Sequence, residues 1–173
     1  FIDAQDIRKQ SYDNIDRILR KVPGVYTRAE TGLGLFPNIS LRGVDPGRSM
    51  KVTIMEDGIL TAPAPYAAPG AYYGPTAGRL SGLEVLKGSS QVRYGPQTTG
   101  GAINYLSTEI PDSEQYYAKT LFGNYGEVRN HLYFGNQLEV DGGRFGYLVE
   151  TFARQTNGYN TIDGTTEFRN VEN

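Results

Sequence analysis

The chain has 173 residues and a formal net charge of −2, with 17 Lys and Arg against 19 Asp and Glu. This balance excludes a strongly basic surface of the kind that binds nucleic acid or an acidic membrane. The chain has no cysteine, which excludes a disulfide scaffold, a thiolate metal site and a cysteine nucleophile. Its 22 glycines and 13 tyrosines instead favour a β-rich protein with many tight turns. The sequence starts at Phe1 rather than at a methionine, so we expect an excerpt of a longer protein.

The first element expected in chain order is a helix over residues 11–22. Its apolar residues recur at the spacing of one helix face: Ile15, Ile18, Leu19 and Val22. Ser11 is the expected N-cap, since a serine hydroxyl accepts a hydrogen bond from a free amide of the first turn. Pro23 and Gly24 are expected to end the helix, because neither residue readily continues a helical ladder.

Short strands separated by turns are expected after the helix. Following an extended segment that starts at Val25, they are expected at residues 38–44, 51–56, 83–87 and 102–107. Residues 61–78 are rich in proline, glycine and tyrosine, which predicts a long loop in place of a regular element. One helix and four short strands predict a small α+β domain that ends near Pro111.

The pattern changes beyond Pro111. Strands of about ten residues are expected at 116–124, 128–138 and 144–154, joined by hairpins, one of them at Asp141-Gly142-Gly143. One face of each long strand is apolar and the other is polar. This alternation is typical of a transmembrane β-barrel, and it is also typical of an ordinary β-sandwich.

Several residues invite a catalytic interpretation that the sequence does not favour. Glu56, Asp57 and Glu84 suggest paired carboxylates, but no base or nucleophile accompanies them. His131, the only histidine, lies on the polar face of a strand and is expected to line a pore or a surface. Gly100-Gly101 is followed by no Lys-Ser/Thr pair, so it does not predict a phosphate-binding loop. We therefore expect no enzyme activity, no cofactor and no metal site.

The order of the segments resembles one known family. The matching motifs are VPGV (22–25), SLRG (40–43), MEDG (55–58), LEVLKG (83–88) and YGPQTTGGAIN (94–104). In this order, and followed by hairpins, they resemble the plug domain of TonB-dependent outer-membrane receptors and the first strands of the barrel. The last motif and the loop at 61–78 look most like the ferric-citrate receptor branch.

The resemblance implies a fold, a function and a set of partners. Residues 1–111 would form a small mixed-sheet plug domain with short helices, and residues 112–173 would begin an incomplete antiparallel barrel. The intact protein would take up a ferric chelate, such as iron(III) citrate or another siderophore, across the cell outer membrane. Its partners would be that chelate, outer-membrane lipid, and TonB bound through a segment upstream of Phe1. No nucleic acid is expected as a partner.

The resemblance also implies roles for individual residues. The residues expected to bind the ligand lie in outward-facing loops: Arg48, Tyr66, Tyr72 and Tyr73, with Arg79 as the alternative to Arg48. Tyrosines in these loops would otherwise pack on the barrel wall. Arg42 and Lys87 would fasten the plug to carboxylates of the barrel, or else form solvated strand ends. Gly100 and Gly101 would form a tight structural turn that brings the backbone close to its neighbours.

A second function class remains open from the sequence alone. A soluble β-rich module that binds a carbohydrate or a protein, without transport, would show the same hairpins and the same tyrosine-rich loop. Downstream sequence discriminates the two classes, because a receptor would continue with many more amphipathic strands.

Overall fold

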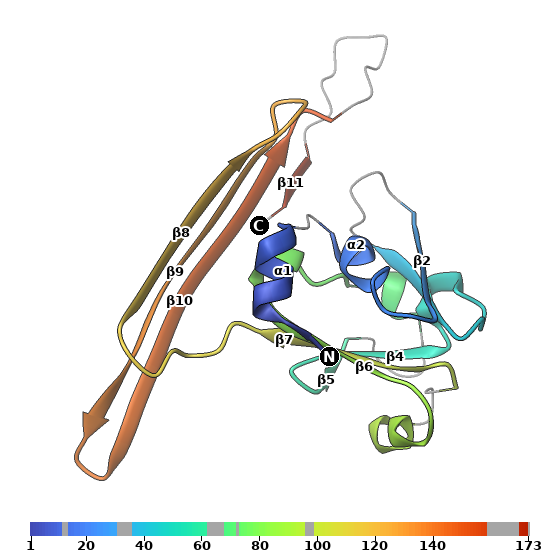
Figure 1. The fold of residues 1–173 in the computed structure, drawn as a ribbon, viewed down its shortest axis with the longest axis horizontal. Coiled ribbons are helices and arrows are strands. Elements are labelled where there is room, and N and C mark those ends of the chain that lie inside the picture. The colour runs from blue at the N-terminus through green and yellow to red at the C-terminus, as the bar shows by residue number, and fades with distance from the viewer. Residues whose placement is uncertain are drawn as a thin grey trace. The chain divides into compact units, whose positions relative to one another are not determined.

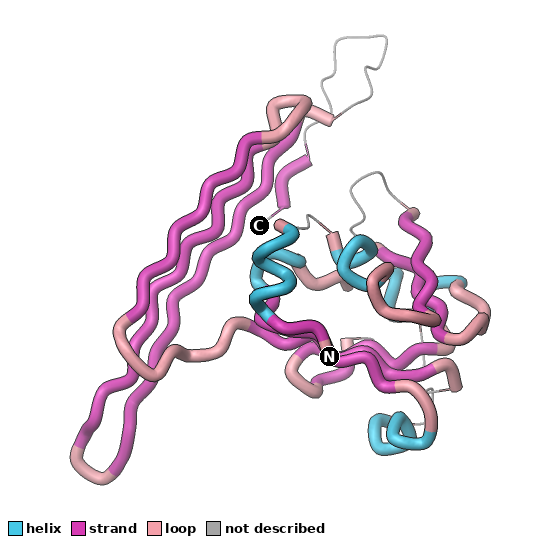
Figure 2. Tube along the Cα trace, in the orientation of Figure 1, coloured by secondary structure: helices cyan, strands magenta, loops and turns pink. Residues whose placement is uncertain are grey.

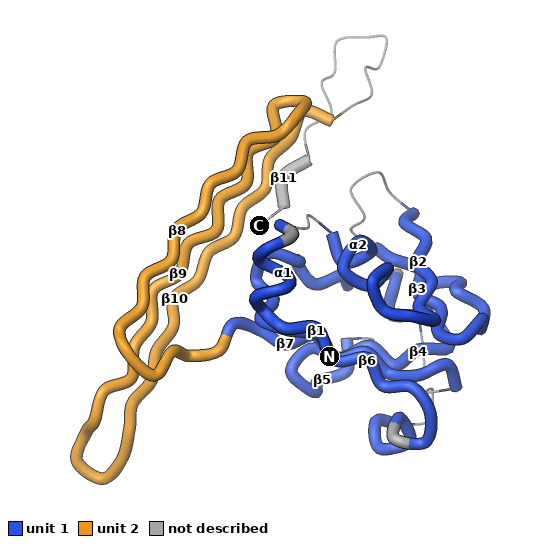
Figure 3. The backbone as a smooth tube through the Cα atoms, viewed as in Figure 1, with its two compact units in different colours: residues 1–108 blue, residues 109–173 orange. Residues whose placement is uncertain are grey.

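The chain folds into two compact units, residues 1–108 and residues 109–173 (Figure 3). The computed structural model describes residues 1–11, 14–30, 36–61, 68–71, 73–95, 99–158 and 170–172. In the described part of the chain, no helix is both long and apolar enough to cross a membrane. The boundary after Thr108 falls three residues before the one expected at Pro111.

The first unit is built on a five-stranded sheet with the order β1-β6-β7-β4-β5 (Figure 1). Its strands are β1 (Ile2–Asp3), β4 (Val52–Glu56), β5 (Ile59–Leu60), β6 (Leu80–Leu86) and β7 (Gly101–Ser107). The β4–β7 pair is parallel and the other pairs are antiparallel, so the sheet is mixed. A separate antiparallel pair joins β2 (Val25–Ala29) to β3 (Pro37–Leu41).

The helical region differs from the expected helix over 11–22. The described residues of this region form two short helices, α1 (Ala4–Gln10) and α2 (Ile15–Leu19). The prediction that Ser11 is an N-cap is wrong: Ser11 has a φ of 48° and ends α1. Asn14 caps α2 instead, because its side chain accepts a hydrogen bond from the Arg17 amide at 2.9 Å. The apolar stripe was predicted correctly, since Ile15, Ile18 and Leu19 are all buried.

The core of the first unit lies between these helices, the β2–β3 pair and the mixed sheet. Its buried residues come from all three: Ile7, Ile15, Ile18, Leu19, Val25, Ile39, Leu41, Val52, Ile54, Ala77, Leu80, Leu83, Ile103 and Tyr105. Strand β3 ends earlier than expected, at Leu41, because Arg42 and Gly43 both take positive φ values and turn the chain. Where the structure describes the connections, they contain four 3₁₀ turns: η1 (Gly47–Ser49), η2 (Pro69–Ala71), η3 (Ala77–Arg79) and η4 (Ser89–Tyr94).

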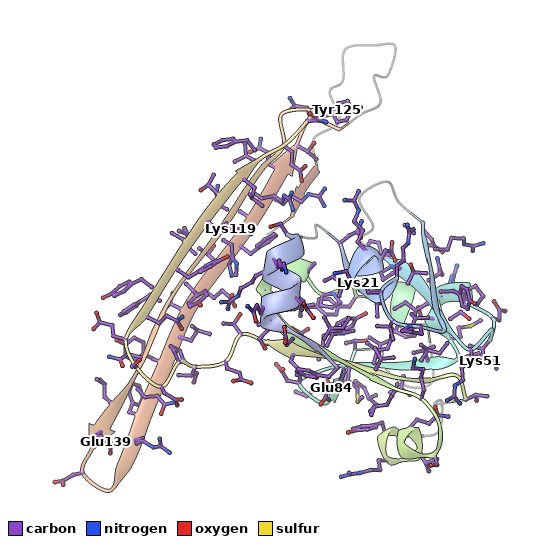
Figure 4. The ribbon with its side chains drawn as sticks, viewed as in Figure 1. Lys21, Lys51, Glu84, Lys119, Tyr125 and Glu139 are labelled. Atoms are coloured by element: carbon purple, nitrogen blue, oxygen red, sulfur yellow. The ribbon has the colours of Figure 1, made fainter. Side chains whose placement is uncertain are left out.

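The second unit is an antiparallel sheet with the order β11-β10-β9-β8 (Figure 2). Its strands are β8 (Gln115–Phe122), β9 (Val128–Val140), β10 (Gly143–Thr156) and β11 (Asn170–Glu172). Tyr125, in the β8–β9 turn, and Glu139, beside the β9–β10 hairpin, mark the two ends of the long strands (Figure 4).

The register confirms that the long strands are amphipathic. Phe145 is opposite Leu138 and Val149 is opposite Phe134, which places the apolar residues of β9 and β10 on one face. Phe145 and Val149 are 57% and 68% exposed, so this face is left largely uncovered. The predicted fold class, a mixed-sheet α+β domain followed by antiparallel hairpins, is confirmed.

Two strand glycines explain where the second unit begins. A Cβ at Gly135 would lie 2.7 Å from Pro111 Cδ, and one at Gly146 would lie 3.0 Å from Ile110 Cγ2. The segment after Thr108 therefore lies against β9 and β10 at positions that have no side chain. These contacts assign Ile110 and Pro111 to the second unit rather than to the first.

Candidate functional site

Arg79, one of the predicted ligand-binding residues, is engaged in a compact polar cluster with Glu56 and Tyr73. Arg79 Nη2 lies 2.6 Å from Glu56 Oε1, and the Tyr73 hydroxyl donates to Glu56 Oε2 at 2.8 Å. Arg79 Nη2 also donates to the Tyr73 oxygen at 2.5 Å. The fold brings these groups together because β4, which ends at Glu56, and β6, which follows Arg79, both pair with β7.

The electrostatics of this cluster favour the ion pair. Burial raises the pKa of Tyr73, and its hydrogen bond to Glu56 raises it further, so the hydroxyl stays protonated and acts as a donor. Burial opposes the charge on Arg79, but the interactions with Glu56 and Tyr73 together outweigh burial and raise the pKa of the guanidinium. Arg79 and Glu56 together are therefore neutral, and an anion that contacts Arg79 must compete with a carboxylate already in place.

Arg48, the other predicted arginine, has a different environment. It lies in the middle of η1 and its side chain is exposed. It has a φ of 50°, and Ser49 after it has a φ of 57°, so two consecutive non-glycine residues are left-handed. Its side chain makes no hydrogen bond or ion pair with the residues that the structure describes. Its positive charge is therefore not neutralised by a described carboxylate.

Tyr73 is the one predicted tyrosine that the structure describes, and it is 37% exposed. Tyr66 and Tyr72 lie outside the described residues. Tyr73 belongs with Arg79, and no described contact joins that cluster to the side chain of Arg48. The predicted ligand-binding residues thus fall into two separate groups within the described structure.

Arg42 and Lys87, predicted to fasten the plug to a barrel, lie near one another at the ends of β3 and β6. The Lys87 Nζ donates to the Pro23 carbonyl at 2.5 Å, so this cation ties β6 to the start of the β2 hairpin. Arg42 is exposed, and its Nη2 would lie 3.9 Å from a Cβ placed at Gly88. Contact with a barrel wall stays a prediction for both residues.

The turn at Gly100 and Gly101 is tightly enclosed. A Cβ at Gly100 would lie 2.8 Å from the Lys51 carbonyl oxygen, and one at Gly101 would lie 2.3 Å from Leu41 Cδ1. Gly101 also has a φ of 146°, and the Gly100 amide donates to Lys51 at 2.7 Å. This geometry supplies a structural reason for glycine at both positions, because a side chain would collide with the residue before β4 or with the end of β3.

The carboxylates that suggested catalysis have structural partners. Asp57 Oδ1 accepts a hydrogen bond from the Ser107 amide at 2.9 Å, and Glu84 accepts one from the Asn104 side chain at 3.0 Å. His131 Nε2 lies 2.7 Å from Glu150 Oε1, and His131 is buried among aromatic rings on the polar face of β9. Among the described residues, no group of three or more His, Asp or Glu side chains is placed to hold a metal ion.

Two residues that the sequence analysis did not single out hold the turn that carries Arg48. Asn38 and Ser49 are 1% and 0% exposed, and both bond to backbone groups of this region. The sequence carried no clear signal for either residue, because Asn38 lies on the polar face of β3 with Ser40 and Ser49 lies in the η1 turn.

Comparison with known proteins identifies the family. Residues 1–102 match the family described as the TonB-dependent Receptor Plug Domain. The chain belongs to this family, which confirms the resemblance inferred from its motifs. It is also 26% identical over 113 residues to the vitamin B12 transporter BtuB of Vibrio vulnificus strain CMCP6, a match that covers 65% of this chain and 18% of that protein.

Solved structures share the fold. The ferric citrate transporter FecA in its unliganded form aligns with a TM-score of 0.68 at 23% identity, over 89% of this chain and 26% of that chain. The pyoverdine outer-membrane receptor FpvA of Pseudomonas aeruginosa PAO1, bound to pyoverdine, aligns with a TM-score of 0.68 at 19% identity, over 91% and 22% of the two chains. The chain thus spans about a quarter or less of the length of these relatives.

Proposed function

We propose that this chain is the plug and the first barrel strands of an outer-membrane receptor that takes up a ferric chelate in a TonB-dependent manner. The observation that carries the proposal is the order of the two units: a plug-family unit followed directly by long strands with one uncovered apolar face. That face would meet lipid once the sheet closes into a barrel, which needs roughly 22 strands.

The plug would both bind the ligand and block the pore. An anionic chelate such as iron(III) citrate would meet Arg48 and the tyrosines of the loop at 61–78 from outside the cell. TonB would bind a segment upstream of Phe1 and remodel the plug to release the chelate inward. Arg42 and Lys87 would contact barrel carboxylates, and no cofactor or chemical reaction is required.

Arg48 is the stronger candidate for contact with an anion. It is exposed and makes no ion pair with the described residues, whereas Arg79 is already bound to Glu56 at 2.6 Å. A charge-assisted hydrogen bond contributes about 1.5–3 kcal/mol. In the full-length receptor we therefore expect Arg48→Ala to weaken binding of iron(III) citrate by roughly 1–2 kcal/mol, or about five- to thirtyfold. Calorimetric titration of the purified receptor measures this change.

Uptake in cells tests the function itself. The complete gene would be expressed in a host that lacks its own ferric chelate receptors, and uptake of radioactive iron would be measured with iron(III) citrate, a ferric catecholate and a ferric hydroxamate. The proposal expects uptake of at least one chelate, and loss of that uptake when TonB is deleted. Uptake of none of them, or uptake that persists without TonB, would overturn it.

A further inference from the structure

The backbone around Arg48 is held in an uncommon conformation by buried polar contacts. Arg48 and Ser49 have φ values of 50° and 57°, a region that disfavours side chains with a Cβ. Such residues persist only where the surroundings enforce the conformation, and they gather at binding and switch sites. A glycine takes a positive φ without this steric cost, yet the two left-handed residues are Arg48 and Ser49 and not the neighbouring Gly47.

Ser49 supplies the first restraint. Its hydroxyl accepts a hydrogen bond from the Ile39 amide at 2.9 Å and donates one to the Pro37 carbonyl at 3.0 Å. One edge of β3 pairs with β2, and on its other edge the Ser49 side chain takes the place of a neighbouring strand. Because Ser49 is fully buried, water cannot substitute for these bonds.

Asn38 supplies the second restraint. Its Oδ1 accepts a hydrogen bond from the Arg48 amide at 2.6 Å, and its Nδ2 donates to the Arg28 carbonyl at 3.3 Å. Asn38 thereby links the Arg48 backbone to both strands of the β2–β3 pair. Its side chain is 1% exposed, so this amide is fixed within the unit.

The third restraint comes from the long loop. Gly70, in η2, lies so close to this turn that a Cβ there would be 3.0 Å from the Pro37 oxygen and 3.2 Å from the Arg48 carbonyl carbon. The left-handed pair is thus held by β3 on one side and by the backbone of the loop on the other. The side chain of Arg48, by contrast, is exposed.

We propose that Ser49, Asn38 and Gly70 are positioning residues that fix the Arg48 backbone. Its guanidinium is then already oriented when an anionic ferric chelate binds. This inference rests on the proposed function. A fixed backbone lowers the entropy lost when the arginine binds, so part of the affinity comes from residues that never touch the ligand. The same contacts make η2 sensitive to the position of Arg48.

The test is a double-mutant cycle in the purified full-length receptor, titrated with iron(III) citrate. We expect Ser49→Ala to weaken binding by roughly three- to tenfold. In an Arg48→Ala background, Ser49→Ala should cause no further loss, because it acts through Arg48 alone. Gly70→Ala, which pushes on the Arg48 carbonyl without removing a polar group, should weaken binding in the same way and covers the case in which Ser49→Ala fails to fold.

Ser40→Ala is the matched control. Ser40 is also a buried serine, but it lies in β3 and its hydroxyl donates to the Val44 carbonyl, at the other end of the turn. Hydrogen exchange of residues 45–50 in the ligand-free receptor gives a readout that needs no ligand. It should be accelerated by Ser49→Ala and unchanged by Ser40→Ala, and iron(III) citrate binding by Ser40→Ala should stay within about twofold of the parent.

The outcomes separate this inference from the proposed function. If Arg48→Ala weakens binding but Ser49→Ala and Gly70→Ala do not, or if their losses add fully to that of Arg48→Ala, the positioning role is overturned while the ligand site stands. If Arg48→Ala leaves the affinity unchanged, the ligand site is wrong and the positioning role is overturned with it. Unchanged hydrogen exchange in Ser49→Ala also overturns the positioning role.

Discussion

Asp16 is a buried acid whose replacement should stabilise the first unit. It lies in α2, is 2% exposed, and neither of its carboxylate oxygens has a hydrogen-bond partner in the described structure. Tyr105 of β7 is also buried with an unbonded hydroxyl, and burial, followed by the charge of Asp16, raises its pKa. Burial raises the pKa of Asp16, and Arg20, which follows α2, only partly opposes this. The charged form of Asp16 is therefore unfavourable in the folded state.

The size of the effect follows from the unmet hydrogen bonds. A buried polar group without a partner costs about 1–3 kcal/mol, and a charged group costs more. Asp16→Asn keeps the shape of the side chain and removes the charge. We therefore expect it to raise the free energy of unfolding of the first unit by roughly 1–2 kcal/mol at neutral pH.

The raised pKa of Asp16 also determines how the free energy of unfolding changes with pH. The pKa of Asp16 is raised above its unfolded value of 3.8, so the folded state holds the proton more tightly than the unfolded state. The contribution of Asp16 to the free energy of unfolding is fully present below pH 3.8, and it is lost as the pH rises through the raised pKa of the folded state. Asp16→Asn should therefore match the parent in acid and exceed it at neutral pH.

The assay is urea unfolding of the whole chain in detergent, with the intact first unit quantified by a short pulse of protease at acidic and at neutral pH. Asp6→Asn is the control, since Asp6 is exposed in α1, and it should change stability by less than about 0.5 kcal/mol. The reasoning fails if Asp16→Asn destabilises the unit at neutral pH, or if its effect is the same at both pH values.

Two further predictions concern glycines. Gly101→Ala should prevent stable folding of the first unit in the same assay. Gly58 also has a positive φ, 81°, but a Cβ there would have nothing within 4 Å, so Gly58→Ala should lower the free energy of unfolding by only about 1–2 kcal/mol. Equal effects of the two substitutions would contradict this prediction. Gly135→Ala should displace Pro111 from β9 and speed limited proteolysis between residues 108 and 112, and an unchanged cleavage rate would show that this contact does not hold the segment.

The elements with long hydrophobic patterns were predictable from sequence, and the short ones were not. Strands β9 and β10 alternate over more than ten residues, so their faces and their hairpin were predicted correctly. Helix α1 has one buried apolar residue, Ile7, which is too little for a periodic signal. The start of α2 was misplaced because Ser11 and Asn14 are both good capping residues, and only the fold decides which one takes the extended conformation.

The polar contacts of the candidate site depend on strand order, which the sequence does not contain. Glu56 and Arg79 are 23 positions apart and meet only because β4 and β6 flank the same strand. The bond between Asn38 and the Arg48 amide likewise requires the chain to fold back on β3. The sequence predicted which residue types are suited to an anion, and the tertiary structure decides which of them is already paired.

That pairing changes how an Arg79 variant must be interpreted. Arg79→Ala would leave Glu56 without its cation beside Tyr73, and a carboxylate freed in this way repels an anionic chelate. Weaker binding of iron(III) citrate by Arg79→Ala would therefore not show that Arg79 touches the ligand. If Arg48 is the residue that binds the anion, adding Glu56→Gln to Arg79→Ala should restore the affinity for iron(III) citrate to within about threefold of the parent. The repelling charge is then gone, and the glutamine still accepts a hydrogen bond from Tyr73. A double variant that binds as weakly as Arg79→Ala alone would mean that the ligand displaces Glu56 and binds Arg79 directly, and the role assigned to Arg48 would then be shared between two separate parts of the plug.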